Sequence, residues 1–189
     1  MIALIDNYDG CVFNLFQLIG HYRRDIRIIR NDQMPVAELQ ALQPDHIVIS
    51  GGGSQPEATG MVREMIRTLT GQVPILGICL GYRALLSAYG ASMSYLDEIM
   101  QGRASQISLA TDCPLFKGLP GEIQGMRYHS MTVPEKEIPE GFRIIARASD
   151  GEVMGVQAGN SSTFGIQFHP ESFLTPEGSR IMKNFLDLD

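Results

Sequence analysis

Short apolar runs alternate with amphipathic segments through the first half of the chain. Four runs of branched apolar residues have the length of strands, and the segments between them carry large apolar residues at helical spacing. The predicted strands are 2–6, 26–29, 46–50 and 73–79, and the predicted helices are 11–22, 35–43, about 57–69 and about 82–89. Apolar strands separated by helices are typical of a parallel sheet covered on both faces. We therefore predict an α/β fold with an open, mostly parallel sheet and helices on both faces.

The second half of the chain is richer in strand-like segments. These segments are 105–110, 141–148, 153–158 and 163–168, and a last helix is predicted over 176–188. No repeat, low-complexity tract or linker composition interrupts the chain, and its length suits one hydrophobic core. We predict a single domain over residues 1–189.

Composition and charge narrow the class of protein. A net charge of −6 offers no electrostatic attraction for nucleic acid or an anionic membrane. Asp6 interrupts the first apolar segment, and no apolar run approaches the roughly 18 residues that span a bilayer, so we expect neither a signal peptide nor a membrane span. The cysteines, Cys11, Cys79 and Cys113, are odd in number and form no C-x-x-C pair, which argues against disulfides or zinc. We expect a cytoplasmic protein without a metal or cofactor.

The segment PILGICLGYR, residues 74–83, places Cys79 at the end of an apolar strand with a glycine two residues to each side. Such glycines suit a tight strand-to-helix turn that presents a nucleophile above a sheet. The N-terminus of the following helix offers free N–H groups and a positive dipole end, which lower a thiol pKa. A structural cysteine fits the segment equally well, because free cysteines are so often buried.

A nucleophilic cysteine needs a base, and the chain has four histidines, at positions 21, 46, 129 and 169. We expect His21 and His46 to have packing or surface roles. His129 lies in a predicted polar loop and could be either a catalytic base or a structural residue. His169 ends an apolar strand, and Glu171 faces the same side of an extended chain, so its carboxylate can hold the imidazole by the second nitrogen. The tripeptide H-P-E, residues 169–171, is by itself typical of a surface turn. Together with a cysteine in a tight strand-to-helix turn (a nucleophile elbow), it indicates a Cys–His–Glu triad.

Three polar segments, 6–10, 50–57 and 79–83, follow predicted strands of the parallel sheet. Ligands of open α/β sheets bind where loops leave the carboxyl ends of the strands, so we expect the site there. The glycine-rich stretch 50–54 would expose backbone N–H groups that stabilise an oxyanion beside the sulfur. The alternative, a phosphate cradle of the Walker type, requires a lysine that this loop lacks.

Together these segments resemble the class I glutamine amidotransferases, and most closely the small glutaminase subunits of anthranilate synthase and aminodeoxychorismate synthase. LIDNYDGCVFNL is similar to the family's D-N-Y-D-S-F-x-x-N-L, VISGGGSQPE to S-P-G-P-G-x-P, and GICLGYR to G-x-C-L-G-H-Q. MQGRAS resembles M-H-G-K-x-S, RYHSM resembles R-Y-H-S-L, and GIQFHPESFLTPEG resembles G-x-Q-F-H-P-E-S-x-x-T-x-x-G. The matches run almost from end to end.

The resemblance implies a flavodoxin-like class I architecture in which Cys79 is the nucleophile, His169 the acid and base, and Glu171 its orienting carboxylate. It also implies an oxyanion hole and a glutamine site. The backbone amides implied for the oxyanion hole belong to Gly52 and Leu80, and the implied glutamine contacts are Gly52, Gly53, Ser54, Arg83, Ser130 and Met131. The implied partners are L-glutamine and a larger, chorismate-using synthase subunit that receives ammonia.

Several positions depart from the family pattern. Tyr82 and Arg83 replace the histidine and glutamine after the elbow, Gly51–Ser54 replace P-G-P-G, and Gln101 and Arg103 replace the histidine and lysine of M-H-G-K. Arginine offers only donors and a permanent charge, so we expect weaker glutamine binding than a glutamine at position 83 would give.

Two other functions stay open at this point. One is a related class I enzyme with another acceptor, or a stand-alone γ-glutamyl hydrolase. The other is a regulatory or binding subunit that keeps the fold but recognises glutamine poorly. If the chain is the glutaminase subunit of a chorismate-using synthase, its sequence is compatible with either anthranilate or 4-amino-4-deoxychorismate as the product.

Overall fold

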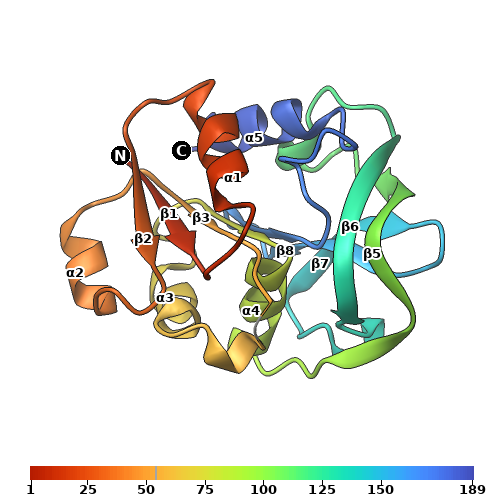
Figure 1. Ribbon diagram of the computed structural model, residues 1–189, viewed down its shortest axis with the longest axis horizontal. Helices are drawn as coiled ribbons and strands as arrows, with labels where there is room; N and C mark the ends of the chain where they lie inside the picture. Colours follow the sequence, from red (N-terminus) through yellow and green to blue (C-terminus); the bar gives the residue numbers. More distant parts are fainter. Residues whose placement is uncertain (54) are drawn as a thin grey trace.

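A computed structural model describes residues 1–53 and 55–189, through which one nine-stranded sheet runs (Figure 1). The strand order is β2-β1-β3-β4-β9-β8-β7-β5-β6. Five neighbouring strands pair in parallel: β2 (Ile26–Arg30), β1 (Ile2–Asp6), β3 (His46–Ile49), β4 (Ile75–Ile78) and β9 (Thr163–Ile166). The remaining four pair antiparallel: β8 (Val153–Ala158), β7 (Phe142–Ala148), β5 (Ser94–Leu109) and β6 (Glu122–Thr132).

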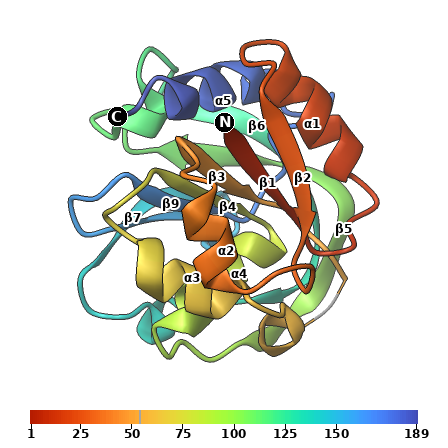
Figure 2. The same ribbon diagram turned by 90° about the vertical axis from the view of Figure 1, so that its left-hand side faces the viewer.

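The parallel strands are apolar on both faces because successive side chains enter two different cores. Ile2 and Leu4 of β1 pack in the core under α1 (Val12–Gly20) and α5 (Gly178–Leu186). Ala3 and Ile5 enter the other core, under α2 (Val36–Ala41), α3 (Val62–Leu69) and α4 (Leu80–Ala88). Figure 2 shows α1 and α5 on one side and α2, α3 and α4 on the other. The predicted α/β class and the placement of helices on both faces are confirmed.

The predicted order of strands and helices in the first half is also confirmed, with shorter elements. A 3₁₀ turn, Pro56–Ala58, precedes α3 where one helix over 57–69 is predicted, and α4 begins at Leu80, directly after Cys79. The last predicted helix forms as α5. No helix among residues 1–53 and 55–189 has the length and apolarity needed to cross a membrane.

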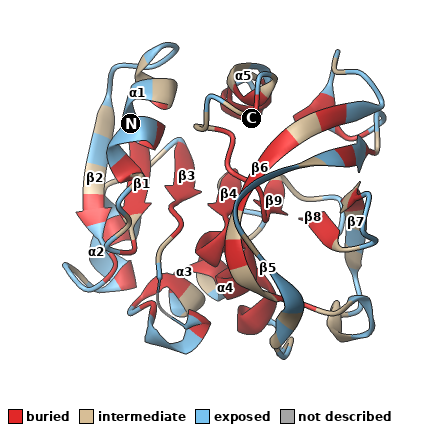
Figure 3. Cartoon of the chain, turned by 45° about the vertical axis from the view of Figure 1, so that its right-hand side comes forward, coloured by how far each residue is buried: buried red, intermediate tan, exposed pale blue. Residues whose placement is uncertain are grey.

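The largest difference from the sequence prediction is the long hairpin of β5 and β6. Only residues 105–110 of it are predicted as strand, and the segment around His129 is predicted as a loop but lies within β6. Figure 3 shows β5 exposed along most of its length and β6 more buried. Most of β5 is exposed, and its apolar residues occur as adjacent pairs such as Tyr95–Leu96 and Ile99–Met100 rather than at alternate positions. The strand therefore lacks the period-two alternation by which strands are identified, and pairing with β6 defines it.

Two glycines control the turn from β4 into α4. A Cβ on Gly77 would lie 2.5 Å from the carbonyl oxygen of Gly81, and a Cβ on Gly81 would lie 2.6 Å from that of Ile49. Side-chain carbons do not approach backbone atoms so closely, so α4 rests on β3 and β4 only because both side chains are absent. The predicted role of the glycines around Cys79 is thereby confirmed.

Adding a methyl group at this contact should destabilise the fold. We expect Gly77→Ala to lower the free energy of unfolding by about 3 kcal/mol, because the rigid backbone of Gly81 must move. Gly121→Ala is the matched control, since a Cβ there meets nothing within 4 Å and should change stability by less than about 0.5 kcal/mol. Urea unfolding of the three proteins makes the comparison, and equal midpoints would contradict the close packing.

Candidate active site

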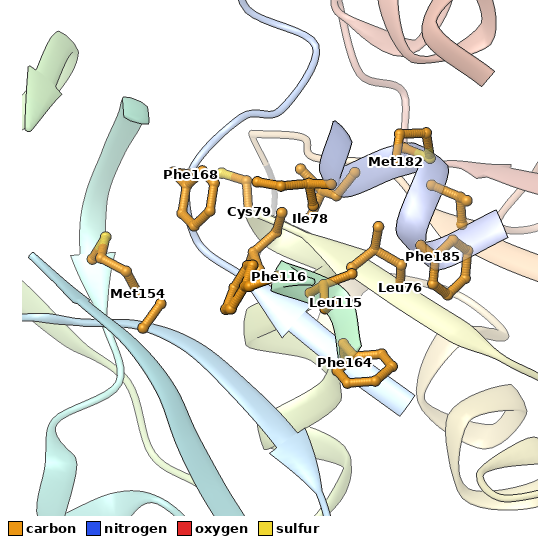
Figure 4. Close-up of a cluster of buried hydrophobic side chains, with 14 of the residues drawn as sticks. Leu76, Ile78, Cys79, Leu115, Phe116, Met154, Phe164, Phe168, Met182 and Phe185 are labelled. Atoms are coloured by element: carbon orange, nitrogen blue, oxygen red, sulfur yellow. The ribbon is translucent and has the colours of Figure 1, made fainter. Parts of the chain in front are cut away.

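Cys79 occupies the strained turn between β4 and α4. Its backbone has φ of 53° and ψ of −102°, a region that non-glycine residues seldom adopt. The turn is held by the Cys79 N–H, which donates to the carbonyl of Ile166 at 2.8 Å, and the Sγ lies 3.9 Å from the carbonyl oxygen of Tyr128. Figure 4 shows Cys79 among the buried apolar side chains that anchor this turn. The thiol is thus fixed at the carboxyl ends of β4 and β9.

His169 reaches the same place from β9, the neighbour of β4 in the sheet. Its N–H donates to the carbonyl of Met126 at 2.9 Å, and its Nδ1 lies 2.5 Å from Oε1 of Glu171. Both side chains of this pair are almost fully buried. The Nε2 of His169 has no hydrogen-bond partner among the described residues. One ring nitrogen is therefore held by a carboxylate while the other is open.

The charges of Cys79 and His169 support one another. Burial acts to raise the pKa of the Cys79 thiol, but the interaction with His169 and the charge of Arg83 outweigh it, so the pKa is lowered. Burial acts to lower the pKa of His169, but Cys79 and Glu171 hold it well above its usual value. Both shifts favour a thiolate–imidazolium pair near neutral pH, the reactive form of a nucleophilic cysteine.

A cavity of about 270 Å³ opens in front of these two residues. Of the residues that the resemblance implies, Gly52 and Gly53 line it together with Cys79 and His169. Its other lining residues are Tyr8, Asp9, Gly10, Cys11, Gln101 and Tyr128. Within the described chain, four implied residues are absent from this lining: Leu80, Arg83, Ser130 and Met131. Ser54 lies outside the described residues.

Gly52 and Leu80 lie against each other beside the elbow. Gly52 has φ of 147°, and a Cβ there would lie 2.8 Å from the carbonyl oxygen of Asn7 and 3.0 Å from Cδ2 of Leu80. The loop after β3 therefore packs on the first residue of α4, which only glycine permits. This contact brings together the residues whose amides are predicted to form the oxyanion hole, and that role stays a prediction.

Ser130 and Met131 lie on β6, where a buried polar network fixes the backbone. The Nε of Arg127 donates to Nε2 of His129 at 3.0 Å, and its Nη1 donates to Asp150 at 2.5 Å. The Nδ1 of His129 lies 2.9 Å from the carbonyl oxygen of Met131. Burial lowers the pKa of His129 to about 4, so the ring is neutral and Nδ1 donates. His129 is a structural residue of β6.

Arg83 lies in the interior although it is charged. It is 6% exposed, and its backbone N–H donates to the carbonyl of Cys79 at 3.1 Å in the first turn of α4. Within residues 1–53 and 55–189, its guanidinium forms no hydrogen bond or ion pair, and its Nε is fully buried. The side chain therefore stays largely within the protein and pairs with no acidic neighbour in the described chain.

The sequence-based assignment of site residues does not include Asp9, Cys11 and Tyr128, which line the cavity. The sequence did indicate a site near Asp9, because the polar segment 6–10 follows a parallel strand. Cys11 is predicted inside a helix, whereas it precedes α1 as its N-cap and faces the cavity. Tyr128 stacks edge-on against the ring of His169 at 4.9 Å between centroids, and no local pattern indicates this contact. No group of three His, Cys, Asp or Glu side chains in the described chain could hold a metal ion.

Comparisons with known proteins show which family and which relatives the chain resembles. The family described as Glutamine amidotransferase class-I matches residues 3–188. The Bifunctional protein TrpGD of Thermotoga maritima is 42% identical over 99% of the chain, which spans about a third (32%) of that relative's length. Aminodeoxychorismate/anthranilate synthase component 2 of Bacillus subtilis is 33% identical, with 99% of this chain and 96% of the relative covered. The crystal structure of a putative GMP synthase protein from Thermoplasma acidophilum is similar, with a TM-score of 0.86, 27% identity and coverage of 98% of this chain and 91% of that one.

The thiols should differ in reactivity although two of them line one cavity. At pH 7 we expect a chloroketone that mimics glutamine to label Cys79 faster than Cys11, because a lowered pKa increases the thiolate fraction and a raised pKa decreases it. The pKa of Cys11 is raised by burial and by Asp9, and burial raises that of Cys113. Labelling of Cys79 should decline only below its lowered pKa, whereas labelling of Cys11 should increase toward alkaline pH.

Peptide mapping by mass spectrometry after timed labelling measures the three rates. Cys79→Ser serves as the control that reports the slow background at Cys11 and Cys113. Equal rates at Cys11 and Cys79 would contradict the assignment of a single activated thiol.

Proposed function

Because the chain belongs to the class-I glutamine amidotransferases, we propose that it hydrolyses L-glutamine at Cys79 and supplies the ammonia to a chorismate-using synthase subunit. Its enzyme class is that of a glutamine amidotransferase, in which glutamine hydrolysis releases the side-chain amide nitrogen as ammonia for transfer to an acceptor. The observation that carries the proposal is the buried pair of Cys79 and His169, oriented by Glu171 and open to a cavity beside Gly52.

The geometry supports a two-step reaction. The Cys79 thiolate attacks the side-chain amide carbon, and backbone N–H groups of Gly52 and Leu80 stabilise the oxyanion. His169 donates a proton from Nε2 to the leaving nitrogen, so the C–N bond breaks and ammonia departs from a glutamyl thioester. Neutral His169 then takes a proton from water, which attacks the thioester and releases glutamate and the thiolate. Glu171 retains Nδ1 throughout, so Nε2 is the nitrogen that exchanges protons.

The partner proposal is supported by the relative's name and by the surface around the cavity. The Bacillus subtilis relative is a component 2, a term that implies a first component. Tyr8 lines the cavity and is 58% exposed, Ile99 is 61% exposed two residues before cavity-lining Gln101, and Phe173 is 86% exposed two residues after Glu171. Large exposed apolar side chains around an active-site mouth suit a protein interface. We propose that the synthase subunit covers this mouth and receives the ammonia there.

Two further proposals concern organisation and location. Residues 1–189 act as a single glutamine amidotransferase domain, since one sheet and its two apolar layers include both chain halves. The protein works in the cytoplasm, a proposal supported by its free cysteines, Cys11, Cys79 and Cys113.

Arg83 supports the second candidate function, a regulatory subunit with weak glutamine recognition. The guanidinium stays in the interior beside the elbow, where a positive charge repels the α-ammonium group of glutamine. The intact triad favours the glutaminase, because a purely regulatory subunit needs neither a lowered thiol pKa nor a held imidazole.

Substitutions in the triad test the proposed function directly. Cys79→Ser and His169→Ala should each reduce glutamine hydrolysis by about 10⁴-fold or more, while Glu171→Ala should retain more activity because it only orients the base. Glutaminase assays with the co-purified synthase subunit measure this order. With ammonium salt replacing glutamine, each variant complex should still form the aminated chorismate product. Glutamine-dependent activity that survives in His169→Ala would refute the assignment.

Replacing Arg83 tests glutamine recognition. Arg83→Gln should lower the KM for glutamine by about tenfold and change kcat less, because a regained hydrogen bond to a charged group contributes about 1.5–3 kcal/mol away from the reacting amide. Steady-state kinetics with and without the partner provide the values, and Arg83→Lys is the control that keeps the charge and should leave KM high. An unchanged or increased KM in Arg83→Gln would mean that the arginine itself anchors the substrate, and the regulatory reading would lose its support.

A further inference from the structure

Asp9 has no role in the reaction above, yet it is one of the residues that line the catalytic cavity. The residue lies between β1 and α1, where its N–H donates to Oδ1 of Asp6 at 2.9 Å and its own Oδ1 accepts from the N–H of Cys11 at 3.0 Å. These two bonds close the turn that leads into α1. The second oxygen, Oδ2, is buried and has no hydrogen-bond partner among the described residues. The hydrogen bonds of the turn explain the position of Oδ1, but they do not explain why Oδ2 is buried without a partner.

Gly51 shows what the second oxygen faces. A Cβ on Gly51 would lie 3.2 Å from Oδ2 of Asp9 and 3.3 Å from Cε1 of His169. The carboxylate oxygen and the edge of the imidazole therefore border the same small space, no further apart than the sum of those two distances. Nδ1, on one side of Cε1, is held by Glu171, and Nε2, on its other side, is free. Asp9 is thus a second carboxylate beside the ring.

We propose that Asp9 is a positioning residue of the glutaminase, whose free carboxylate oxygen holds the protonated His169 ring in place from its Cε1 side. The inference rests on the proposed function, because the ring must remain an imidazolium until ammonia leaves. A buried carboxylate with an unpaired oxygen is costly to maintain unless a positive group lies near it. The imidazolium of His169 is that group, and Gly51 provides the space between them.

Titratable groups from several elements surround Asp9. His169 and Glu171 face it from the segment after β9, Asp6 from β1, Cys11 from the start of α1 and Cys79 from the elbow. Burial raises the pKa of Asp9, and the hydrogen bond from the Cys11 N–H and the positive charge of His169 partly counteract that increase. Because such coupling is mutual, ionised Asp9 favours the protonated ring and also raises the pKa of the Cys79 thiol. Asp9 therefore moves the pH range of the thiolate–imidazolium pair upward.

Asp9→Asn is the variant that separates charge from structure. Asparagine keeps the shape and the oxygen that accepts from the N–H of Cys11, but it removes the negative charge. Asp32→Asn is the matched control, because it removes an equal charge near the same edge of the sheet. Asp32 accepts from the Tyr8 hydroxyl at 3.0 Å and does not line the cavity.

We expect both limbs of the pH profile of kcat/KM to move about half a unit to lower pH in Asp9→Asn, with KM at the optimum nearly unchanged. The imidazole of His169, followed by NMR titration in the substrate-free protein, should shift in the same direction. The profile of Asp32→Asn should coincide with that of the parent protein. Equal melting temperatures of the two variants would confirm that the turn before α1 is intact.

The two measurements separate the inference from the function on which it rests. If the parent protein hydrolyses glutamine but neither the pH profile nor the titration of His169 changes in Asp9→Asn, Asp9 only forms the turn and the inference is overturned. If the complex shows no glutamine hydrolysis at all, the proposed function fails, and the NMR titration still decides whether Asp9 acts on the ring.

Discussion

The packing of α4 directly onto the backbone of β3 and β4 is the constraint on which the rest of the site depends. It sets the height of Cys79 above the sheet and aligns the first turn of α4 with the loop that contains Gly52. The neighbouring strand β9 then delivers His169 at the same level. Three adjacent parallel strands, β3, β4 and β9, thus bring Gly52, Cys79 and His169 together beyond their carboxyl ends, where open α/β sheets bind ligands.

The site concentrates features that a stable interior avoids. The backbone of Cys79 is strained, and buried polar atoms of Asp9, His169, Glu171 and Arg83 lack partners in the described chain. Each of these costs free energy in the folded state, and they tend to occur together where chemistry is performed. The glycines and apolar side chains beneath the elbow offset that cost through close packing. The closely packed residues beneath the carboxyl ends of the strands stabilise the fold, and the strained and unpaired groups lie above those ends, at the cavity.

Local patterns were enough to predict the alternating strands and helices, the elbow at Cys79 and the pairing of His169 with Glu171. In each of these the residues concerned are neighbours in sequence, so spacing alone reports their geometry. The hairpin of β5 and β6 could not be predicted in this way, because the apolar residues of β5 do not alternate along most of its length and the strand is defined by its partner. The same holds for Tyr128 against His169, and for the buried position of Arg83. These depend on elements that meet only in the folded chain.

The place of β9 in the sheet has a consequence for biosynthesis. It pairs with β4 although β5 to β8 lie between them in sequence, so Ile75 meets Thr163 only after most of the chain has been made. Pairing across so long an interval is a late and slow step in folding. Until it occurs, Cys79 lacks both the carbonyl of Ile166 that holds its turn and the imidazole that ionises its thiol. Before that strand is inserted, the thiol of Cys79 lacks the interaction that lowers its pKa, so the reactive thiolate becomes favoured only in the folded chain.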